Sequence, residues 1–127
     1  MPFNHHLGLH VSRMHKDGIS LDCTLRPEML NWLGTLHGGV TATLVDAAIG
    51  VAVIALAGGR RASTVDMTIS YLRPGTDAKY HCQSRLRKMG KTLAFGDAEV
   101  RDSHGHLIAT GTATYVYLEE DGAGKAK

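Results

Sequence analysis

Hydrophobic and polar residues alternate along several stretches of this chain, a pattern typical of strands that bury one face. The clearest alternation lies in 61–72, where Met67 and Ile69 would share one face and Thr64 would point to the other. Shorter or weaker alternations predict further strands over 7–15, 19–25, 78–89, 92–101 and 106–118, the first two joined by a hairpin turn at Lys16-Asp17-Gly18.

One long segment, 40–57, lacks this alternation and predicts a helix of about 27 Å, at about 1.5 Å per residue. Its main apolar stripe, at spacings of three and four, consists of Val40, Leu44, Ala47, Val51, Ile54 and Ala55. Gly58-Gly59 follows as a typical C-terminal stop, and no Ser, Thr, Asp or Asn directly precedes Val40 as an N-cap. We therefore expect the first backbone N–H groups of the helix to be available to a ligand.

One helix early in the chain and five or six antiparallel strands predict an α+β domain. The helix is apolar on more than one face, and a single sheet covers only one of them, so we expect another chain to cover the rest. At 127 residues the chain has room for one core, and we expect one domain over 1–127 with flexible ends at 1–6 and 119–127.

Composition narrows the possible functions without naming one. Charged residues make up 20% of the chain and the net charge is +2, too small to indicate nucleic acid but compatible with a local basic patch for a phosphorylated ligand. Cys23 and Cys82 show no CxxC spacing, and the N-terminus shows no secretory signal pattern. We expect reduced thiols in a cytoplasmic protein.

The apolar segment 40–57 also reaches the lower length limit for a membrane span. Asp46 opposes that interpretation, because a carboxylate near the bilayer centre costs about 3 kcal/mol. We therefore expect a helix buried in protein and no membrane insertion.

The candidate chemistry lies in the same segment. His37-Gly38-Gly39 opens the helix, and unpaired N–H groups at a glycine-opened helix end can bind an anion. Asp46 is the only ionisable residue between Val40 and Ala57, on a different face from the main stripe. Burying an unpaired carboxylate costs on the order of several kcal/mol, so we expect the chain to use it. An oxyanion site beside an acid suggests acyl transfer or hydrolysis.

These residues belong to a larger set that resembles the hotdog-fold thioesterases, in the branch of phenylacetyl-CoA thioesterase and thioesterase superfamily member two. The resemblance runs from about residue 7 to residue 117. It rests on Asn31, on Gly34 to Gly39, on Thr41 to Asp46, on Thr64-Val65-Asp66-Met67 and on Gly90-Lys91-Thr92-Leu93-Ala94-Phe95. The combination is far more specific than the His-Gly-Gly motif by itself.

The resemblance implies a curved antiparallel sheet wrapped around the central helix, sheets joined side by side in a homodimer, and often a homotetramer built from two dimers. It places active sites between protomers and implies hydrolysis of an acyl- or aryl-CoA thioester to a free acid and CoA, without a cofactor. The N–H of Gly38 or Gly39 would polarise the carbonyl, and Asp46 would act as general base or nucleophile. Asn31 would orient the water or the carbonyl, and Thr64 would position the water.

Each of these residues also has a simpler interpretation. His37 is expected to fix its loop by hydrogen bonds in preference to transferring protons. Asn31 could be a turn residue that bonds its own backbone, and Thr64 a β-branched strand residue. For Asp66, which follows Thr64 closely, we expect a structural hydrogen bond to loop amides.

Two sets of basic residues suggest ligands. His5, His6, His10 and His15 cluster in the sequence, but no Cys or acidic spacing supports a closed site, and we expect no metal. Arg60, Lys88 and Lys91 stand at ends of predicted elements and are our candidates for the 3′-phosphate and pyrophosphate of coenzyme A.

Two other functions compete with hydrolysis. A hotdog hydratase or dehydratase would pair a catalytic His with an acid in a different local motif. A non-catalytic acyl-CoA-binding module would have no reason to keep Asp46. The acyl group and the choice between dimer and tetramer stay open at this point.

Overall fold

The computed structural model describes residues 2–119, which form a single layer of six strands with one long helix. Every predicted strand and the predicted helix are confirmed. The elements are α1 (Pro2–His6), β1 (His10–His15), β2 (Gly18–Thr24), the 3-10 turn η1 (Pro27–Met29), α2 (Gly38–Leu56), β3 (Ala62–Tyr71), β4 (Lys79–Met89), β5 (Leu93–Asp102) and β6 (Leu107–Tyr117).

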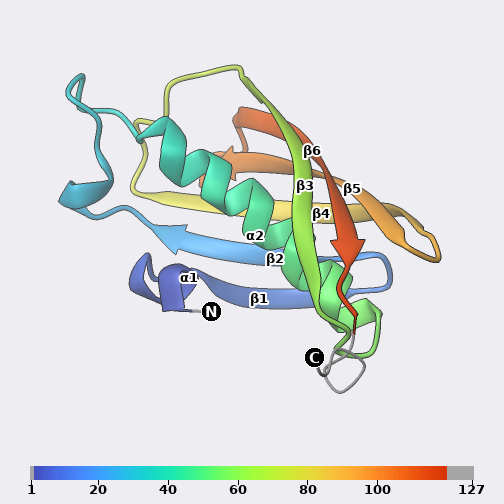
Figure 1. The fold of residues 1–127 in the computed structure, drawn as a ribbon. Coiled ribbons are helices and arrows are strands. Elements are labelled where there is room, and N and C mark those ends of the chain that lie inside the picture. Colours follow the sequence, from blue (N-terminus) through green and yellow to red (C-terminus); the bar gives the residue numbers. More distant parts are fainter. Residues whose placement is uncertain (1, 120–127) are drawn as a thin grey trace.

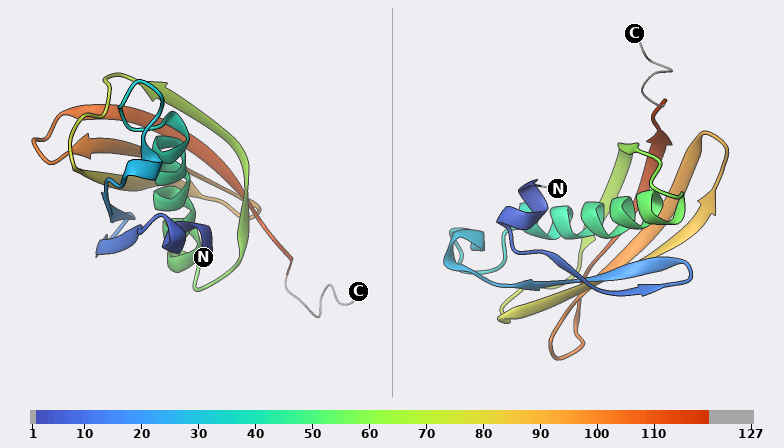
Figure 2. Two further views of the ribbon diagram at one scale, coloured as in Figure 1. Left: turned by 90° about the vertical axis from the view of Figure 1, so that its left-hand side faces the viewer. Right: turned by 90° about the horizontal axis from the view of Figure 1, so that it is seen from below.

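The six strands form one antiparallel sheet in the order β1-β2-β4-β5-β6-β3. The sheet curves around α2, which lies against its concave face (Figures 1 and 2). β1 and β3 are the edge strands, so each has one side without a strand neighbour among the described residues. This architecture is the hotdog fold expected from the sequence.

The helix buries only part of the stripe that we expected, namely Val40, Leu44 and Ala47. Leu44, Val45, Ala48 and Ile49 are fully buried against the sheet, whereas Ala55, which we placed in the main stripe, is exposed. Because α2 is apolar on nearly every side, its hydrophobic periodicity did not single out the face that contacts the sheet. The expected stripe is therefore correct for its first three members, and the buried face is rotated from it toward Val45, Ala48 and Ile49.

Two glycines in the central strands let α2 lie close to the sheet. A Cβ atom on Gly111 would lie 2.6 Å from Val45 Cγ1, and one on Gly96 would lie 2.9 Å from Ile49 Cγ2. Real Cβ atoms do not approach neighbours this closely, so a side chain at either position would push the helix away. The position of Asp46 over the sheet depends on this close packing.

α2 is long and apolar enough to pass a length-and-composition test for a membrane span. In the structure it packs against five of the six strands, and ten of its residues are buried. The expectation of a helix buried in protein is confirmed.

Within the N-terminal segment that we expected to be flexible, Pro2–His6 form the short helix α1, and its flexibility stays a prediction. Leu7, which follows α1, is buried, and the Arg26 guanidinium donates a hydrogen bond to the His6 carbonyl. Most of the tail that we expected to be flexible, residues 120–127, lies outside the described residues, as does Met1.

Candidate functional site

The first turn of α2 is capped by a histidine. His37 has extended backbone angles (φ −62°, ψ 134°), and its Nδ1 accepts a hydrogen bond of 2.8 Å from the Gly39 N–H. Its carbonyl accepts from the N–H groups of Val40 and Thr41, at 2.9 and 3.3 Å. The expectation of an uncapped helix is therefore wrong, because an imidazole nitrogen replaces the usual hydroxyl or carboxylate. His37 thus fixes its loop by a hydrogen bond, as we expected, and its part in proton transfer stays a prediction.

This cap leaves one N–H group of the first turn free. The Gly38 N–H has no acceptor within residues 2–119, whereas the Gly39 N–H is occupied by His37. The Tyr71 hydroxyl donates a 2.7 Å hydrogen bond to the Gly38 carbonyl and so holds the glycine in place. Gly38 lines a cavity of about 410 Å³. A fixed donor at a helix N-terminus suits a developing oxyanion.

Asn31 lies in the loop before α2 and lines the same cavity. Its Oδ1 accepts hydrogen bonds from the N–H groups of Leu33 and Thr35, at 3.0 and 3.1 Å, and its Nδ2 donates to Thr35 Oγ1 at 2.9 Å. The turn interpretation of Asn31 is thus confirmed. An amide nitrogen carries two hydrogens, so one remains for a ligand, and the orienting role stays a prediction.

Asp46 is half-buried on α2, and its Oδ1 accepts a hydrogen bond of 2.8 Å from Thr64 Oγ1 on β3. A β-bulge makes this contact possible. Thr64 pairs with Tyr115 and Asp66 pairs with Thr114, so the extra residue, Val65, has no partner on β6. Strict alternation would turn Thr64 away from the face of Met67, and the bulge restores it to that face. Thr64 therefore positions the Asp46 carboxylate by a hydrogen bond. Its expected role in positioning a water molecule stays a prediction.

Tyr115 is the site residue that sequence analysis missed. Its side chain is only 4% exposed, and its hydroxyl contacts Asp46 twice, at the backbone carbonyl (2.6 Å) and at Oδ1. Burial, followed by the hydrogen bond to Asp46, raises the pKa of Tyr115, so the hydroxyl keeps its proton and acts as a donor. Two signals were available: Tyr115 alternates inward on β6, and Gly50, one helical turn after Asp46, leaves room for a large side chain.

Asp66 does not make the expected bond to loop amides. Asp66 is exposed, and within residues 2–119 its carboxylate accepts no hydrogen bond. Loop amides are instead bound by Asp77, which accepts from the Ser103 N–H at 2.8 Å, and by Asp102, which accepts from the His104 N–H at 2.9 Å. Hydrogen bonds from Ser103 and from the Ala78 amide lower the pKa of Asp77 to about 2.

Asp77, Asp102 and His104 are also the one set of three metal-ligating side chains in residues 2–119 whose ligand atoms lie within 4.8 Å of one another. Both carboxylates already bind backbone amides of the β5–β6 turn. These hydrogen bonds stabilise the turn and explain why the three side chains lie together. The cluster lies outside the site built by Gly38 and Asp46.

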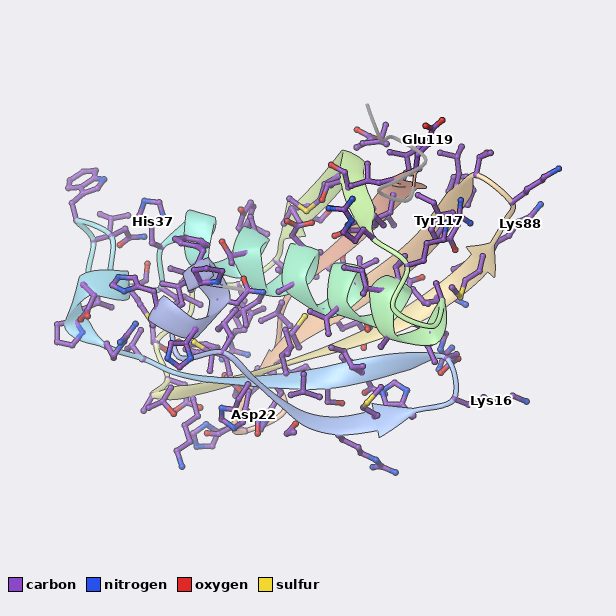
Figure 3. All side chains as sticks on the ribbon, turned by 60° about the horizontal axis from the view of Figure 1, so that its bottom comes forward. Lys16, Asp22, His37, Lys88, Tyr117 and Glu119 are labelled. Carbon is purple, nitrogen blue, oxygen red and sulfur yellow. The ribbon has the colours of Figure 1, made fainter. Side chains whose placement is uncertain are left out.

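Two of the predicted phosphate-binding cations, Arg60 and Lys91, lie next to each other just beyond the C-terminal end of α2. The Arg60 guanidinium stacks 4.3 Å above the Tyr117 ring and approaches the Lys91 carbonyl at 3.5 Å. Lys88 extends outward, and Figure 3 shows it at the opposite end of the molecule from His37. Within one protomer, Lys88 therefore lies far from the glycine motif that follows His37.

The two halves of the candidate site are also far apart within one protomer. Gly38 and Asp46 are separated by eight residues of α2, which corresponds to about 12 Å along the helix axis. Along β3, Thr64 contacts the acid and Tyr71 contacts Gly38, and these residues are about 23 Å apart at about 3.3 Å per residue. A single carbonyl group cannot contact both halves in one chain.

The cysteines offer no alternative nucleophile. Cys23 and Cys82 are free and buried, and burial raises the pKa of both thiols. A buried, protonated thiol is a poor nucleophile.

Comparison with known proteins identifies the family. The family model described as the thioesterase superfamily matches residues 33–109. The medium/long-chain acyl-CoA thioesterase YigI of Escherichia coli (strain K12) is 32% identical, with 91% of this chain and 85% of YigI covered. The chain therefore belongs to the thioesterase superfamily.

Solved structures agree with this assignment. The crystal structure of a protein from the thioesterase superfamily is 36% identical, covers 93% of this chain and 90% of its own, and superposes with a TM-score of 0.87. Zebra fish thioesterase superfamily member 2 is 29% identical, with 87% and 81% covered and a TM-score of 0.80. The resemblance drawn from the sequence is confirmed, and the chain is a hotdog-fold thioesterase.

Proposed function

We propose that this protein hydrolyses acyl-CoA thioesters to a free acid and CoA. The proposal rests on the presence of two groups in the same chain. One is a fixed Gly38 N–H without an acceptor in residues 2–119, and the other is an Asp46 carboxylate positioned by hydroxyl groups. A thioester is already activated, so an oxyanion donor and a carboxylate are sufficient for its hydrolysis. The names of the relatives support the same reaction.

We propose further that each active site is shared between two protomers. β3 has a free edge, with Thr64 near one end and Tyr71 at the other. If two copies of β3 pair antiparallel about a two-fold axis near Met67 and Thr68, Thr64 of one copy lies beside Tyr71 of the partner subunit. Asp46 is then brought to Gly38 of the partner subunit. The exposure of Val65 and Tyr71 on β3 supports this interface.

In the shared site, the thioester carbonyl oxygen accepts the Gly38 N–H hydrogen bond. Asp46 takes a proton from water while the water oxygen attacks the carbonyl carbon, and negative charge develops on the oxygen facing Gly38. When the tetrahedral intermediate collapses, the C–S bond breaks and the thiolate of CoA receives the proton from Asp46. In the alternative mechanism, Asp46 attacks the carbonyl carbon itself, and the C–S bond breaks to release CoA as its thiolate and leave a mixed anhydride. Water then hydrolyses the anhydride to the free acid and the Asp46 carboxylate, and the proton that water loses passes to the thiolate.

The cations around Arg60 would hold the CoA phosphates in this arrangement. Arg60 is bound to Tyr117, two residues beyond Tyr115 on β6, and so lies on the Asp46 side of the protomer. A CoA whose thioester contacts Asp46 and Gly38 of the partner subunit would extend its phosphates toward Arg60, Lys91 and Lys88. Guanidinium and ammonium groups suit this role because they bind phosphate by charge-assisted hydrogen bonds.

The experiment that tests the proposal measures CoA release from acetyl-, hexanoyl-, palmitoyl-, phenylacetyl- and benzoyl-CoA. It compares the wild type with Asp46→Asn, an isosteric change that removes the base. The name of YigI makes the hexanoyl and palmitoyl esters the first to test. A fall of about a hundredfold or more in the folded variant supports hydrolysis, in line with the loss of a general base. Tight binding of every ester without turnover by either protein would contradict it and favour the binding module.

A further inference from the structure

We propose that Tyr115 is a positioning residue that fixes Asp46 through one carboxylate oxygen and leaves Oδ2 as the oxygen that reacts. This inference rests on the proposed function, because it assigns a task within the same site. Tyr115 lies on β6 and Asp46 on α2, so the contact joins the two layers of the fold at the acid.

The hydrogen bonds around Asp46 are strongly asymmetric. Oδ1 accepts from the Thr64 hydroxyl at 2.8 Å and from the Tyr115 hydroxyl. Among the described residues, Oδ2 has no hydrogen-bond partner, and no Lys, Arg or His lies within ion-pair distance of either oxygen. The carboxylate is thus held by neutral donors at one oxygen, and the other oxygen is available to a water or a carbonyl carbon.

The Tyr115 hydroxyl also fixes the helix backbone beneath the acid. It lies 2.6 Å from the Asp46 carbonyl, so one hydroxyl group contacts both the backbone and the side chain of the same residue. The ring is buried, which restricts the directions that the hydroxyl can take. A double contact of this kind limits the rotation of the Asp46 side chain about its Cα–Cβ bond.

The helix has a matching space for this hydroxyl. A Cβ atom on Gly50 would lie 2.9 Å from the Tyr115 hydroxyl oxygen and 3.1 Å from the ring. Both distances are shorter than ordinary contacts, and glycine in a helix interior is disfavoured relative to alanine by about 1 kcal/mol. Gly50 is therefore explained by the space that Tyr115 needs to reach Asp46.

The Tyr115→Phe variant tests the proposal, because it keeps the ring and removes the hydroxyl. Hydrogen bonds to a charged group favour its charged form, so their loss makes the ionised carboxylate harder to form. We expect kcat to fall about tenfold or more, and the acidic limb of the kcat/KM–pH profile to move to higher pH. KM at the pH optimum should change little, since the hydroxyl faces Asp46.

Two further variants separate positioning from general destabilisation. Tyr80→Phe removes another buried tyrosine hydroxyl, one bonded to Asp77, and should leave the acidic limb in place. Gly50→Ala keeps Tyr115 but displaces its hydroxyl, and should move the acidic limb in the same direction as Tyr115→Phe. An acidic limb that stays in place in both Tyr115→Phe and Gly50→Ala would overturn the proposal, even if kcat fell.

A readout without turnover keeps this inference distinct from the proposed function. The ¹³Cγ resonance of Asp46, assigned by its loss in Asp46→Asn, reports ionisation of the carboxylate directly. A wild type that hydrolyses none of the esters would refute the proposed function, and the NMR titration would still test the contact. A midpoint that rises in Tyr115→Phe supports the positioning role, and an unchanged midpoint contradicts it.

Discussion

The role assigned to the Gly38 N–H can be tested by replacing Gly38 with proline, which removes that one hydrogen-bond donor. Gly38 is the first residue of α2, a position that tolerates proline because its N–H has no partner within the helix. His37 already has the extended backbone angles that a residue before proline prefers. We therefore expect Gly38→Pro to fold with nearly the stability of the wild type.

The catalytic cost should be large. Removing one oxyanion-hole donor typically lowers kcat by about 10²–10³-fold, or about 3–4 kcal/mol of transition-state stabilisation. Gly38→Ala is the matched control, because it keeps the N–H, and its Cβ would meet the Tyr71 ring at 3.4 Å, an ordinary contact. The assay is CoA release under saturating substrate, with folding verified by thermal denaturation.

Comparing the two variants separates the loss of the N–H donor from the steric effect of an added side chain. We expect Gly38→Ala to retain most of the activity and Gly38→Pro to lose nearly all of it. A folded Gly38→Pro variant with kcat close to that of Gly38→Ala would refute the assignment of this N–H as the oxyanion donor.

Three further predictions concern binding and stability. Arg60→Ala should raise KM for an acyl-CoA about tenfold, through the loss of a phosphate contact, and leave KM for an N-acetylcysteamine thioester without phosphates unchanged. Ile49→Ala should lower the free energy of unfolding in urea by about 2–5 kcal/mol, because Ile49 is fully buried, and half-buried Ile54 should cost less when replaced by alanine. The pKa of Asp77 is about 2, below its ordinary 3.8, so Asp77 stabilises the fold above about pH 4 and this contribution is lost toward pH 2. Asp77→Asn should therefore lower Tm at pH 6 and make Tm less sensitive to acid between pH 4 and pH 2.

Much of the fold was predictable because most strands bury one face and expose the other. Alternation located the strands, and Gly58-Gly59 correctly marked the end of α2, where both glycines have positive φ values. The rotation of α2 was not predictable in the same way. A helix that is apolar on nearly all sides has little hydrophobic periodicity. The positions that face the sheet, such as Val45, are therefore determined by contacts with distant residues such as Gly111, which the local pattern does not report.

The residues of the candidate site were easier to propose from the sequence than the contacts between them. Asp46 and Gly38 were proposed from an isolated charge and from the chemistry of a helix start, which are local features of the sequence. Thr64 was predicted only by resemblance, because a bulge at Val65 changes the face on which it lies, and alternation does not report bulges. Tyr115 was missed because its contact joins residues 69 positions apart in the sequence. The histidine cap at His37 was missed because capping statistics favour Ser, Thr, Asp and Asn.

A mixed dimer tests the central claim, a site shared by Asp46 of one protomer and Gly38 of the other, most directly. Asp46→Asn and Gly38→Pro chains carrying different tags are co-expressed, and the heterodimer is isolated by two affinity steps. Each homodimer should be nearly inactive. If the site is shared, the heterodimer contains one site with both groups intact and should show about half the activity of a wild-type dimer. A heterodimer no more active than the two homodimers would contradict the shared site.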